Sequence, residues 1–431
     1  MYDNSLLTIE GGETFGQIYA GGGSQVEIRG GRLGDGLYVG EGGRALLRGS
    51  DFRIDGEPIF ADSWGSIETV DLPARGVLSS LFADGTPFAF TSSEGDWFAP
   101  GTLRVSTSLF LPFPRNINWP WLPTSLPRGL RPGEKLTLAT GKQVGANFTA
   151  GWDSELTIAG GEIGENFEAI GAQVNLLEGS IGDNMDALFG TELNVRGGTI
   201  GYGLEAHRGS VVNISGGRVP EFTARTGSAV NITGGTLGVT VDGDYRSGNI
   251  TLEEGGDLHL TGTDFRLGGN PVEGLEPGSS VVLHWDDRSY LNVTLDGTLA
   301  DSSPFLAYVT NSPDRFIADW QRGGGLAITL TLTVPGDFDG NLVVDAADYT
   351  IWRDNLGGKY DASDYLIWRN AYGWTAPREA LSRPVPEPSI AVTLLCVVAS
   401  IIMARSRKTG RTLLPEESPK SSRRGVPVSQ Y

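Results

Sequence analysis

A short repeat between residues 144 and 240 limits the possible fold more than any other feature of the sequence. Five apolar pairs mark the repeat at steps of 18, 19, 19 and 18 residues: Leu156/Ile158, Val174/Leu176, Leu193/Val195, Val212/Ile214 and Val230/Ile232. Each pair is followed by a turn, a single apolar residue and a second apolar pair. A period this short and steady indicates a solenoid.

Apolar and polar residues alternate within each unit, which predicts strands rather than helices. Strands this short cannot bury an apolar face alone, but coils stacked about 4.8 Å apart would align their apolar pairs into one core. We therefore predict an all-β protein, a parallel β-helix with about 18–19 residues and three short strands per coil. A right-handed coil and a left-handed hexapeptide prism both fit this coil length, and irregular spacing within the coils favours the right-handed form. The 63 glycines suit its sharp corners.

The chain also contains a long-period duplication. Residues 6–49 hold further coils, and the segment 49–59 returns 213 residues later as 262–272. We expect two modules, each a stack of coils whose open end is covered by a β cap. The expected order is coils at 1–60, a cap at 61–110, a proline-rich linker at 111–133, coils at 134–262 and a cap at 263–334. The first module has fewer coils and begins without a signal peptide, so we expect a truncated N-terminus.

Residues 337–348 have the spacing of a calcium-binding loop. Oxygen-bearing side chains occupy loop positions 1, 3, 5, 9 and 12, with the Val343 carbonyl at position 7. The five side chains are those of Asp337, Asp339, Asn341, Asp345 and Asp348. Position 6, usually glycine, is Leu342, where a left-handed backbone costs about 1–2 kcal/mol. Calcium is the expected cofactor; the alternative is that Asp345 and Asp348 only cap a helix that starts after the loop.

The segment 345–353 returns 16 residues later as 361–369. This tandem within residues 335–375 resembles a dockerin, which implies two helices, calcium binding and a cohesin-like partner. In the second copy, the positions equivalent to 337, 339 and 341 are Arg353, Asn355 and Gly357. We therefore expect one calcium site rather than two.

The C-terminal region has a linker at 376–388, an uncharged run at 389–404 and a basic tail at 405–431. The motif residues are Pro386, Glu387 and Pro388 before the run, and Arg405, Arg407 and Lys408 after it. This order resembles the PEP-CTERM sorting signal, which implies export and an exosortase-type sorting enzyme as a partner. We expect a transmembrane helix at 389–404 with the tail in the cytoplasm, and hence a protein anchored in the cell envelope.

Composition narrows the possible partners. The formal net charge is −19, and residues 405–431 hold seven Lys or Arg against two Glu, which leaves about −24 on the rest of the chain. Such a surface repels nucleic acid and suits divalent cations and an extracellular setting. The only cysteine, Cys396, cannot form an internal disulfide. The alternative to an exported protein is a cytoplasmic one.

Catalytic motifs are sparse. The chain has three histidines and no HExxH, GxSxG or phosphate-binding glycine loop. The candidate surface face is an outward column of carboxylates with a neighbouring column: Glu168, Asp186 and Glu205, beside Ile170, Leu188, His207 and Arg225. These charges could bind a cation or a polysaccharide, or simply form a solvated face.

Another outward column holds Asn175, Asn194, Asn213 and Asn231, which predicts an amide ladder. We expect a non-catalytic surface or matrix protein that contacts other cells or polysaccharide. The alternative is a polysaccharide lyase or glycoside hydrolase of β-helix type that carries a dockerin.

Overall fold

The computed structural model describes residues 5–14, 17–33, 37–59, 67–71, 76–91, 102–107, 129–237, 239–241, 244–246, 250–253, 255–285, 293–309, 326–356, 360 and 362–375. The chain divides into two compact units, residues 1–376 and 377–431, and every described residue belongs to the first unit. The expected sorting motif, transmembrane segment and basic tail lie outside the described residues. None of the helices in the described ranges is long and apolar enough to cross a membrane.

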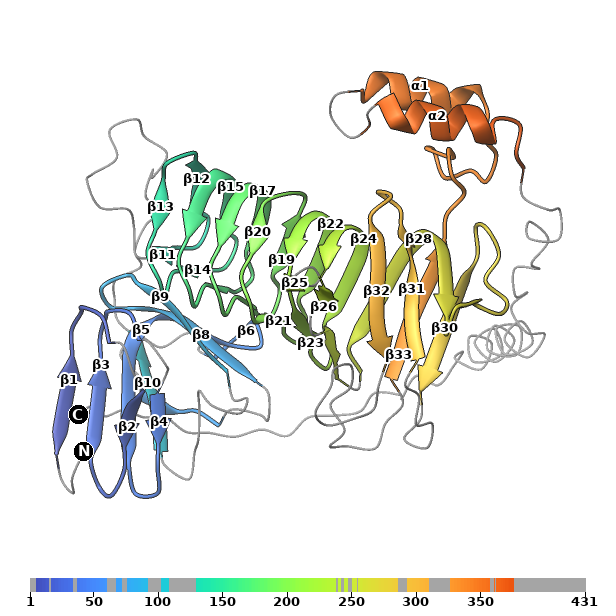
Figure 1. The fold of residues 1–431 in the computed structure, drawn as a ribbon. Helices are drawn as coiled ribbons and strands as arrows, with labels where there is room; N and C mark the ends of the chain where they lie inside the picture. Colours follow the sequence, from blue (N-terminus) through green and yellow to red (C-terminus); the bar gives the residue numbers. More distant parts are fainter. Residues whose placement is uncertain are drawn as a thin grey trace, which may run out of the picture. The chain divides into compact units, whose positions relative to one another are not determined.

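Parallel strands stack into a β-solenoid of about ten turns in the described part of the chain (Figure 1), which confirms the parallel β-helix of the predicted fold class. The second and larger stack has two parallel sheets. The short-strand sheet consists of β11 (Gly129–Leu130), β14 (Thr149–Ala150), β16 (Glu168–Ala169), β18 (Asp186–Ala187), β21 (Leu204–Ala206), β23 (Phe222–Ala224) and β27 (Ile250–Leu252). The long-strand sheet consists of β12 (Lys135–Ala139), β13 (Gln143–Val144), β15 (Glu155–Ile163), β17 (Gln173–Ile181), β19 (Glu192–Val195), β20 (Thr199–Ile200), β22 (Val211–Val219), β24 (Ala229–Leu237) and β28 (Asp257–Leu267) with its cap strands.

The register of the second stack follows the apolar repeat. Leu193 lies opposite Val212, and Val212 opposite Val230, so each column continues from coil to coil. These side chains are at most 1% exposed, as is Ile214. Burying such side chains provides roughly 1.5–3 kcal/mol each, which is why a strand of this length is stable only in a stack.

The structure differs from the expected coil in two details. Four coils merge two of the three expected strands into one nine-residue strand, as in β15 and β22, and the ladder shifts register at the glycine corner. The first coil also begins earlier than expected. Its strand β11 pairs in parallel with β14, although residues 129–130 lie within the predicted linker.

The first stack and its cap have their own sheet and core. The stack consists of β1 (Leu6–Ile9), β2 (Ile18–Ala20), β3 (Gln25–Ile28), β4 (Leu37–Val39) and β5 (Arg44–Ile54), and its cap of β6 (Glu57–Pro58), β7 (Ile67–Thr69), β8 (Val77–Phe82), β9 (Pro87–Thr91) and β10 (Thr102–Thr107). The cap of the second stack contains β29 (Asn270–Pro271), β30 (Ser280–Trp285), β31 (Val293–Leu299), β32 (Pro304–Val309) and β33 (Leu326–Leu332). A separate hairpin, β25 (Val239–Val241) and β26 (Asp244–Arg246), precedes the last coil of the second stack.

The two caps share one topology. In each, the first half of an 11-residue strand continues the parallel stack and its second half pairs antiparallel with a hairpin: β5 with β8–β9, and β28 with β31–β32. The chain then returns to add one more parallel strand, β10 on β5 and β33 on β28. This returning strand pairs with the edge that the last coil would otherwise leave open.

A matching aspartate holds each cap to its stack. Asp84 accepts a hydrogen bond from the Gly31 amide at 2.9 Å, and Asp301 accepts one from the Gly235 amide at 2.7 Å. The residue before each of these glycines is also glycine, and a Cβ there would collide with the aspartate carboxylate. The glycine pair therefore makes room for the contact.

The first cap packs against the second stack. Val77 and Ala89 from the cap form a buried apolar cluster with Ile170 and Leu188. These last two residues were expected on an outward column, and they do point out of their own coil, but the cap covers them to 1% exposure. Beside this cluster, the Trp152 indole N–H donates to the Ser79 hydroxyl at 3.0 Å.

Two helices follow the second cap, α1 (Ala346–Asp354) and α2 (Ala362–Ala371). Their facing aromatic rings pack together, with Tyr349 and Trp368 centroids 5.1 Å apart and Trp352 and Tyr365 also 5.1 Å apart. The repeated Tyr-x-x-Trp spacing of the two helices thus forms one small core. We call residues 335–375 the helical module.

Candidate functional site

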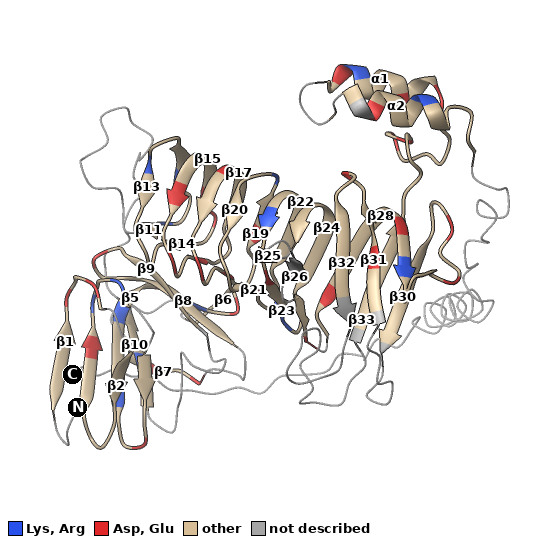
Figure 2. Cartoon of the chain, viewed as in Figure 1, with Lys and Arg blue, Asp and Glu red and all other residues tan. Residues whose placement is uncertain are grey.

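The described residues contain two groups of carboxylate or histidine ligands close enough to hold one metal ion. One lies in the loop before α1, and the other on the outer face of the short-strand sheet. Most strand positions carry no charge, whereas both helices carry acidic and basic residues (Figure 2).

In the loop 337–348, the carboxylate oxygens of Asp337, Asp339 and Asp348 lie within 4.8 Å of one another. Local hydrogen bonds hold them there. Asp337 accepts from the backbone amides of residues 340, 341 and 342, and buried Asp348 accepts from those of residues 338, 339 and 345. Leu342 has the left-handed backbone expected at position 6, with φ of 66°.

The other expected ligands are placed differently. Asp345 is the N-cap of α1 and accepts a hydrogen bond from the Ala347 amide, and Asp348 completes a capping box with it. The helix therefore begins before position 12 of the loop rather than after it. The Asn341 amide group donates to Asp339 at 2.9 Å, and its oxygen accepts from the Val343 amide at 2.7 Å. Three of the four expected carboxylates thus converge, Asp345 caps the helix, and Asn341 is bonded to Asp339 of the converging group.

These three carboxylates suit a hard divalent cation, which prefers oxygen ligands. No lysine or arginine occurs among residues 337–348 to balance them. Burial and the nearby Asp348 charge raise the pKa of Asp337, although the three backbone amides oppose this. The loop therefore concentrates negative charge without an internal counter-charge, which is the electrostatic condition that a bound cation would relieve.

The second group is a chain of ion pairs. Glu168, Asp186 and Glu205 lie opposite one another in successive coils. The His207 Nε2 atom lies 3.0 Å from an Asp186 oxygen and 3.3 Å from a Glu205 oxygen. Glu205 also contacts Arg225 at 2.6 Å, and Glu168 instead accepts from the Thr149 hydroxyl at 3.3 Å.

Arg225 extends the chain of charges to the next coil. Its Nη1 atom lies 3.0 Å from an oxygen of Glu253, which is 6% exposed and also accepts from the Thr226 amide and hydroxyl. Sequence reasoning missed Glu253, because an insertion that includes β25 and β26 interrupts the repeat before it. We call Asp186, Glu205, His207, Arg225 and Glu253 the charge network.

The charge network keeps His207 protonated at neutral pH. Burial alone would lower the pKa of His207, but the hydrogen bonds and charges of Asp186 and Glu205 outweigh it and raise the pKa from 6.5 to about 9. Burial likewise opposes ionisation of Glu205, yet His207 and Arg225 bring its pKa below the usual value. Only neutral imidazole binds a metal, so a cation here would have to displace a strongly held proton.

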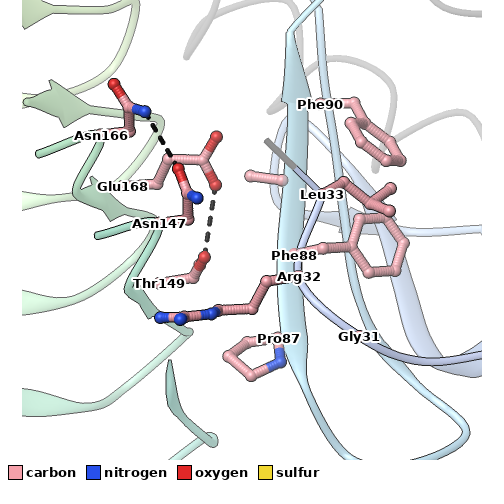
Figure 3. Close-up of a pocket in the computed structure, with 11 residues that line it drawn as sticks. Gly31, Arg32, Leu33, Pro87, Phe88, Phe90, Asn147, Thr149, Asn166 and Glu168 are labelled. Carbon is pink, nitrogen blue, oxygen red and sulfur yellow. Dashed lines mark hydrogen bonds between the residues drawn. The ribbon is translucent and has the colours of Figure 1, made fainter. Parts of the chain in front are cut away.

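A small cleft lies between the first cap and the second stack (Figure 3). The rings of Phe88 and Phe90 point away from it, while Arg32, Thr149 and Glu168 face it. Several polar groups here are paired: Arg32 with Glu13 at 2.9 Å and with the Ala146 carbonyl, and Thr149 with Glu168, whereas the buried Arg32 Nε atom has no hydrogen-bond partner. This pairing indicates a role in joining the two stacks.

Two asparagine ladders run along the second stack. The predicted ladder is present, with amide-to-oxygen distances of 3.0–3.3 Å from Asn175 through Asn194 and Asn213 to Asn231. A second ladder, missed from the sequence, joins Asn147, Asn166 and Asn184 at a corner where all three have positive φ. Its signal was an Asn before the apolar pair at coil spacing.

Comparison with models of protein families, with curated proteins and with solved structures gives no match to this chain.

Proposed function

We propose that this protein is a non-catalytic component of the cell surface or extracellular matrix, in which a β-solenoid displays a binding surface and the helical module binds calcium. The convergence of Asp337, Asp339 and Asp348 within 4.8 Å, in a loop without lysine or arginine, carries the proposal. The oxygen-only ligands and the 12-residue spacing favour calcium over softer metals.

The test is calorimetric titration of the whole protein with calcium. One site is expected, and Asp337→Ala should abolish it because that side chain also organises three backbone amides. The control is Asp364→Ala, which removes the aspartate of α2 that corresponds to Asp348 in the tandem and should leave the site intact. Two equal sites, or unchanged binding in Asp337→Ala, would contradict the proposal.

The charge network supports the non-catalytic part of the proposal. A general base near neutral pH must be able to take up a proton, and His207 already holds one. The carboxylates of Asp186, Glu205 and Glu253 each contact a cationic side chain, an arrangement typical of structural ion pairs.

The enzyme alternative rests on the same residues, since protonated His207 between two carboxylates could serve as a general acid. The combined variant Glu168→Gln, Asp186→Asn, Glu205→Gln decides between the two functions. Wild-type protein is expected to cleave neither acidic nor neutral polysaccharides, with or without calcium. Cleavage that the combined variant abolishes would establish the lyase or hydrolase alternative.

The proposed location and partners follow from two family resemblances, one within the helical module and one in the sequence that follows it. A PEP-CTERM-like signal implies an exosortase-type enzyme and an anchored C-terminus, and the dockerin-like tandem implies a cohesin-like partner. Protease treatment of intact cells should digest the solenoid, and survival of the solenoid beside a digested surface control would overturn this topology. A pull-down with cohesin domains in calcium and in chelator tests the second partner.

A further inference from the structure

Leu342 has an unusual backbone conformation for its side chain. Among the described non-glycine residues with positive φ, the others are all Asp, Asn or Ser, which tolerate this region better than leucine. In a loop of this kind the position normally carries glycine. A strained residue persists where the surrounding structure uses it, so its contacts indicate its role.

The Leu342 side chain lies against Gly278, in the turn that precedes β30. A Cβ added at Gly278 would come 3.0 Å from the Leu342 Cδ1 atom and 3.3 Å from its Cγ. Gly278 also has a left-handed backbone, with φ of 79°. The missing side chain at Gly278 thus provides the space that the leucine side chain occupies.

The turn at Gly278 is bonded to the last strand of the solenoid. The Gly278 amide donates to the Leu332 carbonyl at 2.7 Å, and the Leu332 amide donates to the Ser279 carbonyl at 3.0 Å. Leu332 ends β33, the strand that closes the second stack, and the loop begins five residues later. A contact at Gly278 therefore bears directly on the end of the stack.

We propose that Leu342 is a docking residue whose side chain fixes the helical module to the second cap at Gly278. Strain within the loop is retained because it directs an apolar side chain at a turn that has room for it. The module then reinforces the closing strand β33. This role needs no cation in the loop and is independent of the function proposed above.

The first test replaces Leu342 by Asn or by Gly in the whole protein. Both residues relieve the backbone strain, and neither keeps the apolar contact. Hydrogen exchange at the Gly278 and Leu332 amides should accelerate at least tenfold in both variants. Leu356→Asn is the matched control, because Leu356 is an exposed leucine of the same module, and it should leave these amides unchanged.

If Leu342 is merely tolerated by the loop, its replacement has the opposite signature. The helical module would become more protected and the amides of Gly278 and Leu332 would not change. That result would overturn the proposal.

The second test compares Gly278→Ala with Gly274→Ala. The two glycines have nearly the same backbone, with φ of 79° and 75°, but a Cβ at Gly274 would meet only Val281, 4.0 Å away. Backbone strain should therefore be equal, and only Gly278→Ala should displace Leu342. Faster exchange at the Leu342 and Val344 amides in Gly278→Ala alone is expected, and equal exchange in both variants would refute the docking contact.

Discussion

The two acidic groups of this protein differ in where their counter-charge comes from. On the solenoid, Asp186 and Glu205 are balanced within the fold by His207 and Arg225. In the loop before α1, Asp337, Asp339 and Asp348 lie equally close together, but residues 337–348 include no lysine or arginine. The carboxylates are thus close together in both places. Only the loop has no basic residue of its own to balance their charge.

Whether a cluster of potential ligands can bind a metal therefore depends on the protons and cationic side chains that already contact it. Histidine in the charge network would have to lose a proton before it could bind a metal. In the loop, backbone amides support the carboxylates without neutralising them. The comparison therefore indicates ion pairing for the first group and supports the cation binding proposed for the second.

The largest expected effect concerns pH and the charge network. The pKa of His207 is about 9 in the folded protein against 6.5 ordinarily, so its stabilisation is complete below pH 6.5 and is lost as pH rises to about 9. The shift corresponds to about 3 kcal/mol. Urea unfolding should show the difference between wild type and His207→Gln shrinking by this amount from pH 6 to pH 10. A constant difference would mean that His207 is neutral.

Calcium bound to the loop 337–348 should stabilise the folded protein by a similar or slightly smaller free energy. At a free concentration one hundred times the dissociation constant, binding to the folded state adds about 2.7 kcal/mol. Hydrogen exchange should show this as slower opening of α1, and Asp337→Ala should remove the effect. Asp186→Asn is the matched control for this measurement and should respond to calcium as the wild type does.

Removing the second cation of the charge network should have a smaller effect. Arg225→Gln leaves Glu205 and Glu253 without their shared partner, but the arginine is 28% exposed and water can replace part of the interaction. A loss of about 1–2 kcal/mol is expected in urea unfolding. Arg208→Gln provides the comparison, because that arginine is 56% exposed and contacts Asp55 at 3.4 Å, and it should cost no more than a few tenths of a kcal/mol.

Ionic strength should have the smallest effect, and it should distinguish the two acidic groups. Raising the ionic strength from 0.05 to 0.5 M should weaken calcium binding several-fold, because Asp339, Gly340 and Asn341 of the loop are exposed and screening is effective there. The stabilisation by His207, which is 7% exposed, should change by only a few tenths of a kcal/mol. Equal sensitivity of the two would contradict the distinction in burial.

The solenoid could be predicted from the repeat because successive coils carry similar residues at equivalent positions. Val212 and Ile214 are buried where their columns require, and Asn213 bonds to the asparagines of both neighbouring coils. Contacts between adjacent coils follow from the spacing alone, since residues one period apart must lie side by side. The left-handed backbone at Leu342 was similarly predictable, because the loop spacing demands it at position 6.

Other features depend on segments that the repeat does not relate. The burial of Ile170 and Leu188 comes from a cap some ninety residues earlier in the chain, and Glu253 joins the charge network only after an insertion. Strands β10 and β33 pair with their stacks after excursions of about fifty and sixty residues. No local sequence pattern predicts where these two strands pair. The unpaired backbone edge that stabilises them exists only after the stack has formed.

The sequence by itself therefore determined the column to which each coil residue belongs and the spacing of the carboxylates in the loop. Only the tertiary structure shows which charges meet: His207 contacts Asp186 across a coil, whereas Asp337, Asp339 and Asp348 converge in the loop. Spacing along the chain fixes which groups can meet. The protonation of a buried group depends instead on every charge that folding brings within a few ångströms of it, and those charges come from several coils.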